Sequence, residues 1–118
     1  MLTEKDYCDY DTCVALKELG LSCDDVALKY EANSFACRYE DIPKPSLYEA
    51  QKWLREEKNI IVNICYYQKT DKYNEHWYWI SYQNGHQKNI SGNSSATYEE
   101  ALSEGIKEAI KLLKEEKL

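Results

Sequence analysis

The chain has 118 residues, of which 43% are hydrophobic and 31% charged, with 4 glycines and 2 prolines. This length suits one domain with one hydrophobic core, and the scarcity of glycine and proline excludes long linkers. A total of 15 basic and 21 acidic residues gives a net charge of −6, the wrong sign for holding duplex nucleic acid by neutralising its phosphates. We therefore expect a single domain over residues 1–118 that does not bind duplex nucleic acid.

The N-terminal sequence MLTEKDYCDYDTC carries acidic residues where a secretory signal would be basic and then apolar. No segment approaches the roughly 18 consecutive apolar residues of a membrane-spanning helix. The 5 cysteines are an odd number without close pairing, which is typical of a reducing compartment, and we expect most of them to be buried thiols. These features predict a cytoplasmic protein without a membrane segment.

Residues 9–20 form the first predicted helix. Asp9 or Asp11 supplies its N-cap, because a short side-chain oxygen can accept a free amide of the first turn. Gly20 stands where helices commonly leave through a left-handed residue. The apolar positions of this segment cover more than one narrow stripe of the helix surface.

Two segments with alternating apolar and polar residues follow, VALKYE at 26–31 and FACRYE at 35–40. A period of two residues is typical of a strand with one face in the core. Asn33 and Ser34 supply a turn between the segments, so together they predict a β-hairpin with one solvated face. The prolines of IPKP at 42–45 fix the backbone and indicate a connector.

A capping box of Ser46 and Glu49 opens the second predicted helix, SLYEAQKWLREEK at 46–58. The next segment, IIVNICYYQ at 60–68, is β-branched and aromatic with few polar interruptions. Such a segment is typical of a central strand.

The segment EHWYWISYQNG at 75–85 predicts a strand that returns along 60–68. Asn84 and Gly85 indicate a tight turn, after which HQKNI at 86–90 predicts a short third strand. The polar segment SGNSSA then forms a loop.

The last predicted helix opens with a second capping box, Thr97 and Glu100. Its apolar residues recur at the spacing of one helix face and so predict a helix that lies on the core. These positions are Tyr98, Ala101, Leu102, Gly105, Ile106, Ala109, Ile110 and Leu113. The element order predicts an α+β fold, an antiparallel sheet built from two helix-hairpin units with a C-terminal helix packed on it.

Strand register decides which face of the second hairpin carries Trp77 and Trp79, since a shift of one residue turns every side chain over. If the turn has an even number of residues, both tryptophans join the apolar positions of the first strand. If the number is odd, they lie beside Asn63, Cys65 and Tyr67. In either register the second face is aromatic and needs cover, from a partner or second copy, or from the first helix within the monomer.

Few residues indicate catalysis or metal binding. Cys65 and His76 on adjacent strands would be the minimum for an activated thiol. Cys8, Cys13 and Cys23 lack the close pair of a structural zinc site. The sequence has no phosphate-binding glycine loop, nucleophile elbow or His-Glu-x-x-His motif. We therefore predict no catalytic residue, no metal site and no cofactor, and keep a thiol enzyme as the weaker alternative.

The segments CVALKELG, PSLYEAQKWLREEKNIIV, WYWIS and YEEALSEGIKEAIKLL resemble small uncharacterised proteins carried by phages and mobile elements of gut anaerobic bacteria. The shared features are a short Lys-Glu-Leu-Gly helix, a central helix before a β-branched strand, a Trp/Tyr-rich strand and a terminal helix opened by Tyr-Glu-Glu-Ala. The resemblance spans roughly residues 10–114 and consists of packing and capping motifs. It implies residence in the cytoplasm of a bacterial host and assigns no catalytic residue.

The sequence thus predicts a small, non-catalytic protein-interaction module that self-associates as a homodimer or homo-oligomer. It would be an accessory protein of a phage or mobile element. The predicted interaction surface is the aromatic strand pair or the loop at 84–97, and its acidity suits a basic partner surface. The surface residues are Tyr67, His76, Trp77, Tyr78, Trp79 and Tyr82. The alternative is a sheet face that binds single-stranded nucleic acid or a small aromatic ligand.

Overall fold

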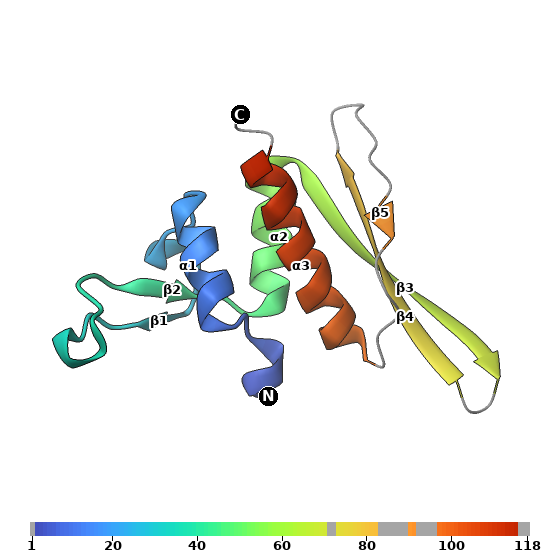
Figure 1. The fold of residues 1–118 in the computed structure, drawn as a ribbon, viewed down its shortest axis with the longest axis horizontal. Helices are drawn as coiled ribbons and strands as arrows, with labels where there is room; N and C mark the ends of the chain where they lie inside the picture. Colours follow the sequence, from blue (N-terminus) through green and yellow to red (C-terminus); the bar gives the residue numbers. More distant parts are fainter. Residues whose placement is uncertain (1, 71–72, 83–89, 92–96, 116–118) are drawn as a thin grey trace. The chain divides into compact units, whose positions relative to one another are not determined.

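The computed structural model describes residues 2–70, 73–82, 90–91 and 97–115, and for 66–70, 73–79, 81–82 and 90–91 it describes the backbone alone (Figure 1). The described residues form three α-helices, a two-stranded sheet and a three-stranded sheet, both antiparallel. The predicted α+β class is therefore confirmed. The chain divides into two compact units, Met1–Ala50 and Gln51–Leu118, here the N-terminal unit and the C-terminal unit. A single domain over residues 1–118 stays a prediction.

The N-terminal unit contains most of the short elements. In chain order these are the 3-10 turn η1 (Glu4–Asp6), helix α1 (Tyr10–Glu18), the 3-10 turn η2 (Cys23–Asp25), strand β1 (Leu28–Tyr30), the 3-10 turn η3 (Ser34–Ala36), strand β2 (Ile42–Lys44) and the start of helix α2 (Leu47–Lys58). The predicted capping box of α2 is present, because Ser46 and Glu49 each accept the other's backbone amide, at 3.1 and 3.0 Å.

Helix α1 begins and ends as its terminal residues dictate. Of the two candidate caps, Asp9 is the N-cap, and its side chain accepts the amide of Thr12 at 2.8 Å. Gly20 takes the predicted left-handed conformation, with φ 117°. The amides of Gly20 and Leu21 bond back to carbonyls of the last turn at 3.0 Å each, which is the Schellman arrangement. Leu21 is buried, so this exit also contributes to the core.

Strand β1 pairs with β2 in antiparallel orientation, with Tyr30 opposite Ile42. The strand partner is thus the segment predicted as a connector, and the predicted second strand at 35–40 is wrong. Pro43 is accommodated because both strands of a two-stranded sheet are edge strands, in which every second amide faces away from the partner strand and makes no ladder bond.

Burial gives the physical reason why residues 42–44, and not 35–40, pair with β1. Ile42 and Pro43 are buried, whereas Phe35 and Tyr39 are exposed to 100% and 82%. The prolines that indicate a connector are apolar enough to fill the core, and the alternating segment is left outside. Core residues of the unit are Cys8, Cys13, Leu16, Leu19, Leu21, Ile42, Leu47 and Ala50.

The C-terminal unit contains the rest of α2, strands β3 (Ile60–Thr70), β4 (Tyr73–Tyr82) and β5 (Ile90–Ser91), and helix α3 (Tyr98–Glu115). The sheet order is β3-β4-β5, and α3 packs on β3 and β4. Asn59, with φ 55°, turns the chain from α2 into β3. The side-chain amide of Gln51 then donates to the carbonyl of Val62 at 2.7 Å and ties α2 to β3.

The predicted apolar face of α3 is largely the buried one. Ala101, Leu102, Gly105, Ile106, Ala109 and Ile110 are buried as expected. Near the end of the helix Leu112 is buried and Leu113 half-buried, the reverse of the prediction, and Tyr98 is 38% exposed. Thr97 caps the helix by accepting the amide of Glu100 at 3.1 Å.

The register of β3 and β4 is the odd one of the two alternatives. Trp77 lies opposite Cys65 and Trp79 opposite Asn63, while Val62 lies opposite Ile80. A shift in register between Gln68 and Thr70, close to the turn, produces the odd count. Val62 and Ile80 are buried, whereas Asn63 and Cys65 are exposed. The positions of both tryptophans therefore fall in line with the exposed positions of β3.

None of the helices in the described residues has the length and hydropathy needed to span a bilayer.

Candidate functional site

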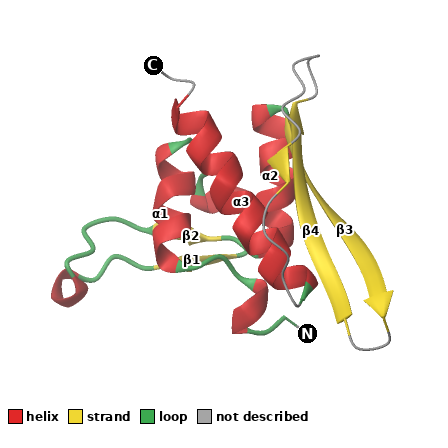
Figure 2. Ribbon diagram, turned by 45° about the vertical axis from the view of Figure 1, so that its right-hand side comes forward, coloured by secondary structure: helices red, strands yellow, loops and turns green. Residues whose placement is uncertain are grey.

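The segment that joins β1 to β2, residues 31–41, is here called the β1–β2 loop. It extends away from the two strands and from α1 (Figures 1 and 2). Asn33 and Arg38 close it with two backbone hydrogen bonds of 2.7 and 2.9 Å. Inside this closure the side chain of Asn33 accepts the amide of Phe35 at 3.0 Å. The tip of the loop is therefore held by its own hydrogen bonds.

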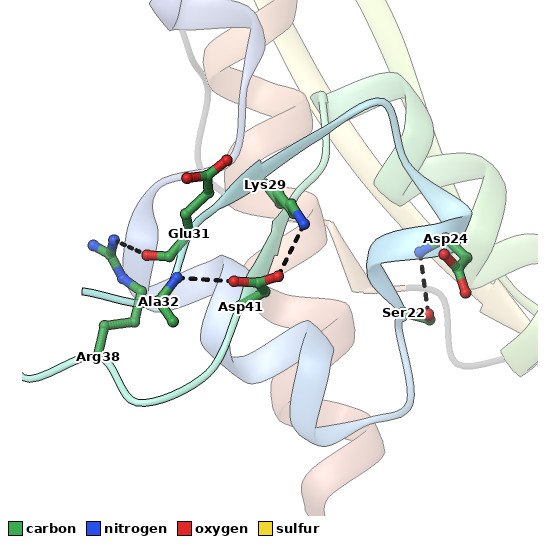
Figure 3. A network of polar contacts seen from close by, with 7 residues as sticks. All are labelled: Ser22, Asp24, Lys29, Glu31, Ala32, Arg38 and Asp41. Carbon is green, nitrogen blue, oxygen red and sulfur yellow. Dashed lines mark hydrogen bonds and ion pairs between the residues drawn. The ribbon is translucent and has the colours of Figure 1, made fainter. Parts of the chain in front are cut away.

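Asp41 anchors the base of the β1–β2 loop (Figure 3). One carboxylate oxygen accepts the amide of Ala32 at 2.8 Å, and the other forms an ion pair with Lys29 at 2.9 Å. The hydrogen bond from Lys29, followed by that from Ala32, lowers the pKa of Asp41 below its ordinary value. The carboxylate is thus ionised at neutral pH and holds both ends of the loop together.

The β1–β2 loop displays the two most exposed large hydrophobic side chains of those that the structure describes. Phe35 is 100% exposed at η3, and Tyr39 is 82% exposed. A single exposed aromatic is common on protein surfaces, but a fully exposed phenylalanine on an ordered projection resembles the anchors that interfaces use. Cys37 lies between them with φ 54°, a left-handed conformation that is uncommon for a residue with a Cβ.

Arg38 lies among tyrosine rings at the base of the tip. Its guanidinium carbon is 5.3 Å from the ring centre of Tyr10 on α1 and 5.1 Å from that of Tyr30 on β1. The two rings contact each other edge to face, at 5.2 Å and 83°. Cation–π contacts of this kind hold the side chain in place without neutralising its charge.

A second cation, Lys44, lies near the ring of Tyr30. The ammonium of Lys44 is 5.4 Å from the ring centre of Tyr30 and 5.1 Å from that of Tyr7. It also forms an ion pair with Glu4 at 3.2 Å, and this hydrogen bond raises the pKa of Lys44. Lys44 is therefore charge-compensated within the unit.

A pocket of about 320 Å³ opens between α1 and the β1–β2 loop. Aromatic and aliphatic side chains supply much of its lining: Tyr10, Val14, Tyr39 and Ile42. Arg38, Cys37 and Glu40 complete it. Glu40 forms an ion pair with Lys17, so the carboxylate in the wall is already neutralised.

The side chains of the predicted interaction surface, Tyr67, His76, Trp77, Tyr78, Trp79 and Tyr82, lie outside the described residues, and that surface stays a prediction. The backbone register assigns their positions to two sets. Positions 67, 77 and 79 fall in line with the exposed Cys65, whereas positions 76, 78 and 82 fall in line with the buried Val62.

The cysteine positions limit thiol and metal chemistry. Cys65 lies opposite Trp77, and His76 lies opposite Tyr66, so the register does not pair Cys65 with His76. Cys13 is buried, which raises its pKa to about 12 and keeps the thiol neutral. In the described part of the chain, no group of three or more His, Cys, Asp or Glu side chains could hold a metal. Cys37 and Cys65 are exposed, so the expectation of mostly buried thiols is wrong for these two.

Sequence reasoning missed the residues that gather at the β1–β2 loop. Phe35 and Tyr39 share a period-2 pattern with core strands, and nothing local distinguishes an exposed aromatic from a buried one. Arg38 meets Tyr10 and Tyr30 only through the pairing of β1 with β2 and the packing of α1 on β2. The turn residues Asn33 and Ser34 were the available signal, because they placed a projecting tip at this point.

Comparisons with protein-family models, with curated proteins and with solved structures found no match to this chain. The geometry of the β1–β2 loop and its pocket is therefore the basis for a functional assignment.

Proposed function

We propose that this protein is a small non-catalytic protein-interaction module, and that the β1–β2 loop is its docking surface. The observation that carries the proposal is Phe35, fully exposed on a loop that its own hydrogen bonds hold in shape. We further propose, from the sequence resemblance, that the partner belongs to a bacterial host and that the protein is an accessory of a phage or mobile element.

Preorganisation makes such a loop effective in binding. Association is opposed by the loss of conformational freedom in loops and side chains that become ordered at the interface. The Asn33–Arg38 closure and the Asp41 anchor fix the backbone before any partner arrives. Phenylalanine also loses few rotamers when it is buried. A partner with an apolar recess can therefore gain the burial of Phe35 at small entropic cost.

Site-specific crosslinking tests the docking surface directly. A photoreactive phenylalanine analogue at position 35 is expected to capture a host protein, whereas the same analogue at the exposed Lys5 is not. With the captured protein purified, Phe35→Ala is expected to weaken its affinity about tenfold or more, since aromatic anchors dominate interface energies. The matched control Leu28→Ala removes an exposed apolar side chain outside the loop and should leave the affinity unchanged. Equal capture at positions 35 and 5, or unchanged affinity of Phe35→Ala, would refute the proposal.

Self-association through the sheet is a second candidate. It is favoured by the exposure of Asn63 and Cys65 and by the register that brings positions 77 and 79 into line with them. Helix α3 packs on β3 and β4, and residues Ile60, Val62 and Ile80 of these strands are buried. Positions 63 and 65 of β3 and positions 77 and 79 of β4, on the opposite face of the sheet, would then form the contact between copies.

A further inference from the structure

Among residues 2–50, Arg38 has no carboxylate partner, unlike the three lysines that lie in or beside its part of the unit. Three lysines of the unit each form an ion pair: Lys17, Lys29 and Lys44. Among residues 2–50 the guanidinium of Arg38 donates one hydrogen bond, from Nη1 to the carbonyl of Glu31 at 2.9 Å, and it contacts the rings of Tyr10 and Tyr30. Its positive charge is therefore uncompensated by any acid of this unit.

One terminal nitrogen of this guanidinium, Nη2, is available for an anion. The group has five N–H donors in a planar fork. Nε has no acceptor in the described structure but is enclosed, so an anion in the pocket does not reach it. The second terminal nitrogen, Nη2, is turned away from Glu31 (Figure 3). A partly enclosed cation with unmatched donors is a position where an oxyanion gains charge-assisted hydrogen bonds.

The pocket beside Arg38 specifies the rest of the ligand. Tyr10, Val14, Tyr39 and Ile42 offer ring and aliphatic surface over a volume of about 320 Å³. With Glu40 paired to Lys17, the wall contributes one unpaired positive charge and more apolar than polar surface. These properties match a compact apolar group that carries one negative charge.

We propose that this pocket binds a monocarboxylate with an aliphatic or aromatic body, supplied either by a free carboxylic acid or by the C-terminal residue of a peptide. A phosphate dianion is disfavoured, because Arg38 is the one cation in the pocket wall and the chain has a net charge of −6. The proposal does not depend on Phe35, which is not part of the pocket lining.

An NMR titration of the ¹⁵N-labelled full chain tests the charge requirement. The probe is 3-phenylpropionate, and 3-phenylpropionamide is its neutral match. We expect the acid to shift the amide signals of α1 and the β1–β2 loop, with a Kd at least about tenfold below that of the amide, since tenfold corresponds to one modest interaction. Equal affinity for acid and amide, or tighter binding of inorganic phosphate, would overturn the proposal.

Variants locate the site. Arg38→Gln should weaken binding of 3-phenylpropionate about tenfold or more, and Lys5→Gln, which removes an exposed lysine of the same unit, should not. Since Arg38 also contacts two rings, Val14→Phe provides a second variant that fills the pocket and leaves the guanidinium in place; it should weaken binding as well. If both variants bind 3-phenylpropionate with wild-type affinity, the ligand binds elsewhere and the proposal is wrong.

The two sources of the carboxylate are separated with peptides. An N-acetylated tripeptide ending in phenylalanine with a free carboxyl group is compared with the same peptide amidated at its C-terminus. Tighter binding of the free-carboxyl peptide than of 3-phenylpropionate assigns the pocket to peptide C-termini, and the reverse order assigns it to small acids. Indifference to amidation of the peptide, together with indifference to amidation of the small acid, contradicts a carboxylate site.

Discussion

At the scale of single residues, short polar side chains determine where the elements of the N-terminal unit begin. Asp9, Ser46 and Asn33 each accept a backbone amide two or three residues further along the chain. Such groups satisfy amides that have no partner inside the helix. Their sequence signal is local, because the capping residue lies within three residues of the amide that it accepts. The starts of α1 and α2 were therefore predicted from the sequence, with Asp11 left as an alternative to Asp9 for α1.

The choice between Asp9 and Asp11 gives the first stability test. Asp9→Ala removes the N-cap of α1 and is expected to lower the free energy of unfolding by about 1 kcal/mol. Asp11→Ala removes an acid of the first turn that caps nothing, and its effect should be a few tenths of a kcal/mol, from the helix dipole alone. Urea unfolding followed by circular dichroism measures both. Equal losses would show that Asp9 does not act as the cap.

The pKa of Asp41 carries a stability consequence with a definite sign. Its folded-state pKa is lowered by Lys29 and Ala32, so the fold favours the ionised carboxylate. The resulting stabilisation is present above the ordinary pKa of the unfolded chain and is lost as the pH falls through the folded value. The β1–β2 loop therefore depends on a charge that is intact at any physiological pH.

At the scale of elements, α3 was predictable because its signal is periodic and long. A repeat of apolar residues over several turns specifies which side of a helix meets the core. The buried face of α3 departs from the predicted one only at the end of the helix, where Leu112 is buried and Leu113 half-buried. Tertiary packing decides between neighbours near a helix terminus, because a small rotation carries either one to the sheet.

This pair of leucines provides a matched test of the packing of α3. Leu112→Ala is expected to lower the free energy of unfolding by about 2 kcal/mol or more, the usual loss for a buried leucine. Leu113→Ala deletes the same atoms from a half-buried position and should lose about half as much. Denaturant unfolding of both variants measures the difference. A larger loss for Leu113 would restore the phase that the sequence pattern predicted.

Short strands were the elements that sequence reasoning placed least well. The alternating segment at 35–40 competed with IPK at 42–44 for the pairing with β1, and alternation does not say which segment a strand will meet. The register of β3 and β4 depended on an irregularity between Gln68 and Thr70 that has no sequence signature of its own. The candidate site shares this dependence, since it forms only when Tyr10, Tyr30 and Arg38 are brought together by long-range pairing.

At the scale of the whole molecule, the net charge of −6 opposes self-association unless an apolar contact outweighs the repulsion between copies. The proposed contact lies at the exposed positions of β3. Asn63→Arg introduces a charge at each copy's contact and is expected to turn a dimer into a monomer, while the free energy of unfolding of the monomer stays within about 0.5 kcal/mol of wild type. Glu115→Gln, at an exposed position of α3, changes the net charge by the same amount as Asn63→Arg and is the control.

Sedimentation equilibrium over a range of concentrations measures this outcome. A wild-type chain that stays monomeric at the highest concentration would contradict self-association. A dimer that persists unchanged in Asn63→Arg would instead move the contact to another surface.

Pro43 in β2 and Pro45 just after it also restrict how another strand can pair with this edge of the sheet. Alternate residues of a strand direct their backbone polar groups to the same side, and Pro43 and Pro45 stand two apart. The carbonyl of Pro45 is already used by the amide of Cys8 at 3.1 Å, and neither proline has an N–H to offer. A strand from another chain therefore finds no backbone N–H donor at these two positions and cannot form a regular ladder along this edge of β2. The β2 edge of this two-stranded sheet is therefore protected from the addition of a further strand.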